Sequence, residues 1–157
     1  MRRAEVITVS DRSAAGVRED ASGPVAVGLL RDAGWSCGDA RIVADGVDSV
    51  EGALRAALAD GAQLIVTTGG TGLSPRDQTP EGTARVIQRE VPGIAEALRR
   101  EGAGEKPAIM LTRGRAGVTG SALIVNLPGK PAAVASGVPL VLSVAAHILD
   151  QLAGGDH

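Results

Sequence analysis

The stretch "AQLIVTTGGTGLSPRDQTPEGT", residues 62–83, holds the strongest fold signal in this sequence. It opens with an apolar run, residues 62–66, that is typical of a buried strand. Three glycines lie within residues 69–72, so the next segment is a loop with a largely bare backbone. After the loop, Thr79 predicts a helix N-cap and Pro80 the first helical position. We therefore expect a strand, a glycine-rich loop and a helix in that order.

Other short apolar runs lie on both sides of this unit, and we expect each to form a strand: residues 6–9, 40–43, 108–111 and 122–125. Between the runs, apolar side chains recur at helical spacing, which predicts helices over residues 24–33, 49–58, 79–90, 92–100 and 131–152. Continuous apolar strands that alternate with helices indicate a parallel sheet covered on both faces. The sequence thus predicts one α/β domain over residues 1–157, with three α/β/α layers and a mostly parallel central sheet.

The composition narrows the class of partner. Hydrophobic residues make up 44% and charged residues 22% of the chain, which is ordinary for a soluble globular domain. Trp35 is the only aromatic residue, so stacking of bases on several aromatic side chains is disfavoured. The formal charge of −2 gives no general attraction to nucleic acid or to an acidic membrane. We expect neither partner, and an anionic ligand would have to be held by local features.

Two further features bear on the compartment. Cys37 is the only cysteine, which excludes an intrachain disulfide and fits a reducing environment. The amino-terminal residues show no signal-peptide pattern, so we expect a cytoplasmic protein. Residues 131–149 lack Lys, Arg, Asp and Glu, but proline, glycine and serine interrupt them, and we predict a helix buried on most sides rather than a membrane span.

The glycine-rich loop predicts an anion site. In a parallel sheet with right-handed crossovers the carboxyl ends of the strands share one edge, and ligands bind there. Successive backbone N–H groups in residues 69–72 form a concave anion site, to which Thr68 and Thr71 can add hydroxyls. The pattern is neither a dinucleotide fingerprint nor a P-loop. The alternative is a tight turn that needs only one glycine.

An acid follows this loop. Asp77 lies five residues after Gly72, and a carboxylate beside a phosphate is repulsive unless a cation such as Mg²⁺ lies between them. Asp45, just past the strand that ends at Val43, is the best placed second acid, with Asp48 in reserve. The alternatives are that Asp77 caps the next helix or pairs with Arg76, and that Asp45 is a solvated turn residue.

Two more loops are expected at the same edge. Ser10 ends the first strand, and residues 126–131 follow the last one. In the second loop Asn126 offers an amide, Gly129 permits close approach to the backbone, and Lys130 adds charge at a helix N-terminus. A plain strand-to-helix turn is the alternative. Further donors are expected nearby from residues 113–115 and 120–121.

Residues 67–83 resemble the signature of the molybdopterin adenylyltransferase family, the Mog/MoaB group that includes the G domain of gephyrin. The resemblance extends to "VITVSDRSAAGVREDASGP" at residues 6–24, "VADG" at residues 43–46 and "GSALIVNLPGKP" at residues 120–131. The central motif is shared with molybdenum-insertion enzymes and with competence-damage-type proteins, which carry the domain within longer chains.

The resemblance implies an activity and an assembly. Members join the terminal phosphate of molybdopterin to AMP from Mg-ATP and release pyrophosphate. ATP and molybdopterin are thus the expected substrates and Mg²⁺ the expected cofactor. A homotrimer, or a hexamer, and hand-over of the product to a molybdenum-insertion enzyme are also implied.

The resemblance also implies roles for individual residues. Asp77 matches the acid implicated in catalysis, and Asp45 matches the acid thought to share the Mg²⁺. Many relatives have Pro-Asp where this chain has Ala44-Asp45, so Asp48 stays in reserve. With the donors inferred from the loops themselves, the predicted substrate- and nucleotide-binding residues are Ser10, Thr68, Gly69, Gly70, Thr71, Gly72, Ser121, Asn126, Pro128, Gly129 and Lys130.

Two other functions remain open from the sequence. A nucleotide pyrophosphatase of the competence-damage type would hydrolyse a dinucleotide without any pterin. A non-catalytic pterin-binding protein would be expected to lack the metal-binding acids, whereas Asp45 and Asp77 are both present here.

Overall fold

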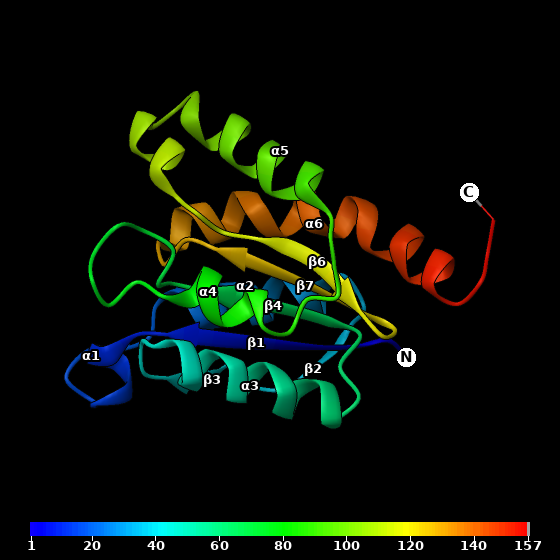
Figure 1. Ribbon diagram of the computed structural model, residues 1–157, viewed down its shortest axis with the longest axis horizontal. Coiled ribbons are helices and arrows are strands. Elements are labelled where there is room, and N and C mark those ends of the chain that lie inside the picture. Colours follow the sequence, from blue (N-terminus) through cyan, green and yellow to red (C-terminus); the bar gives the residue numbers. More distant parts are fainter. Residues whose placement is uncertain (157) are drawn as a thin grey trace.

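The computed structural model describes residues 1–156 and contains a seven-stranded mixed sheet between layers of helices (Figure 1). The strand order is β2-β1-β4-β7-β6-β5, and β3 also pairs with β1. The strands are β1 (Arg3–Val9), β2 (Ser36–Cys37), β3 (Arg41–Val43), β4 (Leu64–Thr68), β5 (Arg89–Glu90), β6 (Ala116–Thr119) and β7 (Ala122–Leu127). The helices are α1 (Asp11–Ala14), α2 (Ser22–Asp32), α3 (Val47–Ala59), α4 (Thr79–Ala84), α5 (Pro92–Ala103) and α6 (Pro131–Leu152), with a 3-10 helix η1 (Pro107–Leu111).

Two aliphatic cores hold the layers together. One core joins α2, α5 and α6 to one face of the sheet, with residues such as Val66, Leu127 and Val138 fully buried. The other joins α3 to the opposite face, where Ile7, Leu54 and Ile65 are fully buried. Because the strands point apolar side chains to both faces, they read as continuous apolar runs. The predicted α/β/α architecture is confirmed (Figure 1).

The central strands are parallel and in register. Thr8 of β1 lies opposite Thr68 of β4, which lies opposite Leu127 of β7. The carboxyl ends of these strands therefore share one edge, where α1 and the loop after β4 also lie (Figure 1). At the other end of the strand order, β6 is antiparallel to both β7 and β5, which makes the sheet mostly parallel, as predicted.

Residues 108–111 are not a strand. They belong to η1, which begins at Pro107, and Met110 and Leu111 are 64% and 57% exposed. Ile109 instead packs close to the backbone of Gly102 in α5. The strand in this part of the chain is β6, which the sequence analysis missed because "AGVT" is short and contains a glycine.

The helix predicted over residues 79–90 is also shorter. It ends at Ala84, and β5 occupies Arg89–Glu90. Gln78, not Thr79, is the N-cap, so Pro80 occupies the second helical position. The Thr79 hydroxyl instead donates to the Gly69 carbonyl at 2.9 Å, and the Thr79 N–H donates to the Gly70 carbonyl at 3.1 Å. Thr79 therefore fixes the glycine loop rather than capping the helix.

Helix α6 is apolar, and by length and composition it is the one helix within residues 1–156 that could cross a membrane. It packs against β7, α2 and α5. Its buried residues are Val134, Gly137, Val138, Val141, Ala145 and Leu149. Only 33% of its most apolar window is buried, so within this chain the helix is covered along one face. The sequence predicted burial on most sides, against the sheet or another subunit, and this single chain supplies only part of that burial.

Candidate anion and metal site

A cavity of about 200 Å³ opens at the carboxyl ends of β1 and β4. It brings together seven of the residues predicted from the sequence: Ser10, Asp45, Thr68, Gly69, Gly70, Asp77 and Gly129. These residues come from the loops that follow β1, β3, β4 and β7. The edge that the topology predicted to bind a ligand is therefore hollow, and both predicted acids line it.

The glycine loop is bare because other groups come close to its backbone. Gly69 and Gly70 have φ of +95° and +67°, values that favour glycine. A Cβ on Gly69 would collide with the Val9 carbonyl, and one on Gly70 would collide with the Thr79 hydroxyl and lie 3.0 Å from Asp45 Oδ1. A Cβ on Gly72 would lie 2.8 Å from Asp77 Oδ2. The glycines thus leave room for the two carboxylates, so the reading as a simple one-glycine turn is wrong.

This loop also presents free hydrogen-bond donors. Within residues 1–156, the backbone N–H groups of Gly70, Thr71 and Gly72 donate to no protein acceptor, whereas the Gly69 N–H donates to Leu127 O at 3.0 Å. Thr71 is only 4% exposed. Successive N–H groups without an acceptor are typical of a site where an anion binds. Gly70 lines the first cavity, but Thr71 and Gly72 do not.

Asp45 is held by main-chain groups. Its Oδ2 accepts the Asp11 N–H at 3.0 Å, and its own N–H donates to Asp11 Oδ1 at 3.0 Å. Burial raises the pKa of the Asp45 carboxyl, and the nearby carboxylates of Asp11 and Asp77 add to the rise. Hydrogen bonding to Asp11 and the charge of Arg76 act in the opposite direction. The charge of Asp45 is therefore only partly compensated, which is a property of metal-binding and catalytic groups.

Asp77 neither caps α4 nor pairs with Arg76, the two alternatives that the sequence left open. Its Oδ2 accepts the Ser74 N–H at 3.1 Å within the loop, and Arg76 bonds Asp11 instead. Asp48 is not a substitute for Asp45. Its side chain is 95% exposed on the first turn of α3 and pairs with Arg85 at 3.1 Å.

The arrangement of the acids fits Mg²⁺ held jointly with a phosphate. No group of three or more potential ligands is found among the described residues, so the protein does not form a complete cage. Mg²⁺ usually binds to one or two carboxylates together with phosphate oxygens and water. Asp45 and Asp77 face the same glycine loop. There is space for their carboxylates because Gly70 and Gly72 have no side chains. These two residues would hold the ion.

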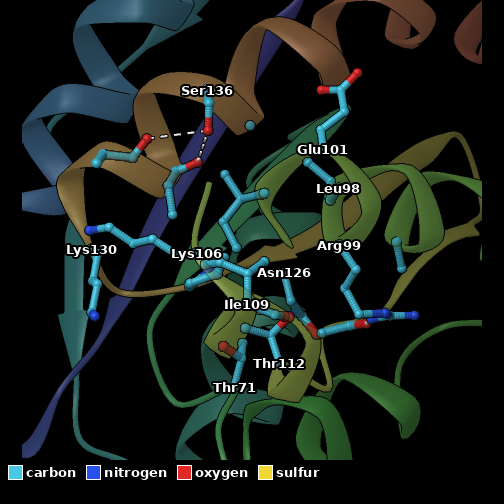
Figure 2. Close-up of a pocket in the computed structure, with 18 of the residues that line it drawn as sticks. Thr71, Leu98, Arg99, Glu101, Lys106, Ile109, Thr112, Asn126, Lys130 and Ser136 are labelled. Carbon is cyan, nitrogen blue, oxygen red and sulfur yellow. Dashed lines mark hydrogen bonds between the residues drawn. The ribbon is translucent and has the colours of Figure 1, made fainter. Parts of the chain in front are cut away.

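A second cavity lies on the other side of the loop, between α5, η1 and the start of α6 (Figure 2). It is lined by Thr71, Asn126, Pro128 and Lys130 from the predicted set, and by apolar residues such as Leu98 and Ile109. Figure 2 shows Lys130 and Arg99 on opposite sides of it. Thr71 belongs to the anion loop and also lines this cavity, so the two cavities are neighbours.

Residues 5–147 match the family model described as a probable molybdopterin binding domain. The chain belongs to this family. It is 43% identical to a molybdenum cofactor biosynthesis bifunctional protein of Synechococcus elongatus over 98% of this chain, and it spans about half (48%) of that protein's length. It is 37% identical to a molybdopterin adenylyltransferase of Helicobacter pylori, over 95% of this chain and 86% of that protein. A solved Mog protein from Mycobacterium ulcerans superposes with a TM-score of 0.91 at 43% identity, covering 97% of this chain and 99% of that one.

In this member of the molybdopterin-binding family, Asn126 does not offer its amide to a ligand. It is 3% exposed, and its Nδ2 donates to Thr67 Oγ1 at 2.9 Å and to Thr83 Oγ1 at 3.0 Å. Its Oδ1 accepts the Arg115 N–H at 3.0 Å. The amide thus joins β4, β7, α4 and the start of β6, and its role here is structural.

Ser121 is not brought to the site. It lies in the turn between β6 and β7, at the opposite end of β7 from Asn126, and the neighbouring Gly120 N–H donates to Gln88 Oε1. Ser121 directly precedes β7, so it lies at the amino-terminal end of this strand, whereas the site lies at the carboxyl ends of β1 and β4. The prediction, which rested on the family resemblance, is therefore wrong for this residue within this chain.

Arg113 is near the site, but as a support for the loop. Its backbone N–H donates to Thr71 O at 2.8 Å, and its guanidinium donates to Gly72 O and Asp77 O, each at 2.9 Å. Glu81 pairs with the same guanidinium at 2.7 Å. Arg113 therefore joins the two ends of the segment between Gly72 and Asp77 in this molybdopterin-binding domain.

Asp20 lines the first cavity and was missed. It accepts the Thr8 hydroxyl at 2.8 Å and the Gly23 N–H at 3.0 Å. Ser22, which also bonds Asp20, reaches the Thr68 hydroxyl at 2.8 Å. The available signal was an acid just before a predicted helix in the loop after the first strand.

Proposed function

We propose that this protein is a molybdopterin adenylyltransferase, which joins the terminal phosphate of molybdopterin to AMP from ATP and releases pyrophosphate. The observation that carries the proposal is the row of free N–H groups at Gly70, Thr71 and Gly72, in a loop faced by Asp45 and Asp77. The relatives named molybdopterin adenylyltransferase support the choice of substrates.

The residues suit a reaction between two anions. The attacking phosphate is ionised at neutral pH, so no side chain is required to remove a proton from it. The principal tasks are to bring the phosphates together and to offset their charge. The three N–H groups of the loop bind phosphate oxygens, and Lys130, at the N-terminus of α6, adds positive charge beside the second cavity.

Asp45 and Asp77 have a separate task. Bound Mg²⁺ would offset the negative charge of the triphosphate and of the leaving pyrophosphate. The two carboxylates would hold that ion, and the bond from the Asp11 N–H to Asp45 Oδ2 fixes the orientation of one of them. The Thr79 hydroxyl, through its bond to Gly69 O, keeps the loop in the shape that exposes its N–H groups.

The direct test is to mix the protein with molybdopterin, ATP and Mg²⁺ and to detect the adenylated pterin by mass spectrometry. We expect product that depends on all three additions. A folded sample that forms no product would contradict the proposal. If a dinucleotide were hydrolysed without pterin, the protein would instead be a nucleotide pyrophosphatase.

We further propose a cytoplasmic homotrimer, with a hexamer as the alternative, that passes its product to a molybdenum-insertion enzyme. The apolar surface of α6 that this chain leaves uncovered supports self-association, and the single Cys37 supports a reducing compartment. Analytical ultracentrifugation tests the assembly, for which a stable monomer would be the contrary result.

A further inference from the structure

We infer that Asp11 and Arg76 form a positioning pair that sets the orientation of Asp45 relative to Asp77. The inference rests on the proposed function, since it takes Asp45 and Asp77 as the holders of the metal ion. Neither Asp11 nor Arg76 lines the cavity itself. They act through Asp45 and are not catalytic residues.

The first contact is between Asp11 and Asp45. Each N–H donates to the other's carboxylate at 3.0 Å, although the residues are 34 positions apart. This exchange occupies Asp45 Oδ2 and leaves Oδ1 on the side of Gly70. Asp11 therefore determines which oxygen of Asp45 faces the glycine loop.

The second contact joins this unit to the loop that carries Asp77. Arg76 is the residue before Asp77, and its Nε and Nη2 reach Asp11 Oδ2 and Oδ1, each at 3.0 Å. Its Nη2 also reaches Asp45 O at 2.9 Å. A bidentate guanidinium–carboxylate pair has a fixed geometry. Arg76 thus fixes the separation of the loop after β3 from the loop after β4.

Charge gives a second reason for the pair. Three carboxylates, of Asp11, Asp45 and Asp77, lie close enough that the charges of Asp11 and Asp77 both act on Asp45. Arg76 neutralises Asp11, which leaves Asp45 and Asp77 as the acids that a cation can satisfy. Without Arg76, Asp11 would be a competing anion behind Asp45.

The pair contributes little to stability. The side chains of Arg76 and Asp11 are 64% and 43% exposed, and exposed ion pairs of this kind are screened by solvent and contribute little to folding. Variants at these positions should therefore fold, and their effect on metal binding can be measured separately. Arg85, which pairs with Asp48 and Glu51 and is similarly exposed, provides a matched control.

The test is a titration with Mn²⁺ alone, followed by electron paramagnetic resonance of the free ion, on the unchanged chain and on Arg76→Gln, Arg76→Lys, Asp11→Asn and Arg85→Gln. We expect Arg76→Gln and Asp11→Asn to weaken Mn²⁺ binding by about tenfold or more. Arg76→Lys should weaken it nearly as much, because lysine keeps the charge but not the bidentate geometry. The variant that carries both Arg76→Gln and Asp11→Asn should bind Mn²⁺ no more weakly than either single variant. Excess Mg²⁺ should restore the turnover of these variants.

The outcomes separate the two claims. If the unchanged chain binds Mn²⁺ and the three variants bind it within twofold of that value, the positioning role is wrong and the proposed function stands. If the unchanged chain binds Mn²⁺ neither alone nor with ATP present, the metal role of Asp45 and Asp77 fails, and the inference fails with it. If a variant raises only the KM for ATP, Arg76 binds the nucleotide and the inference is wrong.

Discussion

Gly69 and Gly129 meet backbone to backbone: a Cβ on Gly129 would lie 3.2 Å from the Cα of Gly69. The loop after β4 and the loop after β7 thus form one surface, lined on one side by the acids and on the other by the second cavity. This contact places the free N–H groups of the glycine loop beside the N-terminus of α6. It explains why residue 129 is glycine, whereas Gly69 is required by its φ of +95° and by the nearby Val9 carbonyl.

Substituting Gly69 by Ala should therefore destabilise the protein. The residue has φ of +95°, and its Cβ would collide with the Val9 carbonyl. We expect a loss of about 2 kcal/mol, or a fall in Tm of about 4–8 °C, by differential scanning calorimetry. The matched control is Gly28→Ala, on an open face of α2, which should be neutral or stabilising. Equal Tm values for Gly69→Ala and the unchanged chain would contradict the fold around this loop.

Asn126→Ala tests the structural role of the buried amide. The change leaves the Thr67 and Thr83 hydroxyls and the Arg115 N–H without their partner. We expect a loss of about 3 kcal/mol in the free energy of unfolding, measured with urea. Ser143→Ala, on an exposed face of α6, should change it by less than about 0.5 kcal/mol. A small effect for Asn126→Ala would return this residue to the ligand-binding set.

Asp77→Asn should remove turnover without removing pterin binding. The carboxylate faces the phosphate loop, where it would act on the metal-bound triphosphate and not on the pterin. We expect turnover to fall by about a hundredfold or more, with the dissociation constant for molybdopterin nearly unchanged. Asp48→Asn, on the outer surface of α3, should leave both quantities unchanged. Retained turnover would exclude Asp77 from the reaction.

The raised pKa of Asp45 predicts opposite effects on stability and on metal binding. Because the folded pKa lies above the unfolded value, ionisation of Asp45 costs stability as the pH rises through the folded pKa. Asp45→Asn should thus raise Tm at pH 7 by about 1–2 °C, since a partly exposed charge contributes less than about 1 kcal/mol. That gain should shrink as the pH falls towards 4. As the pH is lowered, the unchanged chain should lose Mn²⁺ binding at a higher pH than a site whose aspartate has an ordinary pKa. A lower Tm for Asp45→Asn would contradict the prediction.

The sequence predicted the centre of this fold well, for a physical reason. Val66 and Val125 lie in strands buried on both faces, and continuous apolar runs followed by loops rich in glycine or proline are typical of such strands. Gly70 and Asp77 were predicted as site residues because a glycine-rich loop followed by an acid indicates a phosphate site with a bound cation. These features depend on residues that lie close together along the chain.

The parts that were mispredicted depend on residues far apart along the chain. Asn126 looked like a free amide, because its partners Thr67 and Thr83 are 59 and 43 positions away. Residues 108–111 looked like a strand, since a short apolar run alone does not distinguish a strand from a 3-10 turn packed on a helix. Ser121 was misplaced because it precedes β7 and so lies at the amino-terminal edge of the sheet, away from the loops that follow the strands.

The central claim is that the N–H groups of Gly70, Thr71 and Gly72, with Asp45 and Asp77, receive a magnesium-bound triphosphate. A crystal structure with ATP and Mg²⁺ tests it most directly. We expect phosphate oxygens within hydrogen-bonding distance of those three nitrogens and the ion between the two carboxylates. A well-ordered triphosphate bound away from this loop, with Asp45 and Asp77 contacting neither the ion nor the nucleotide, would contradict it.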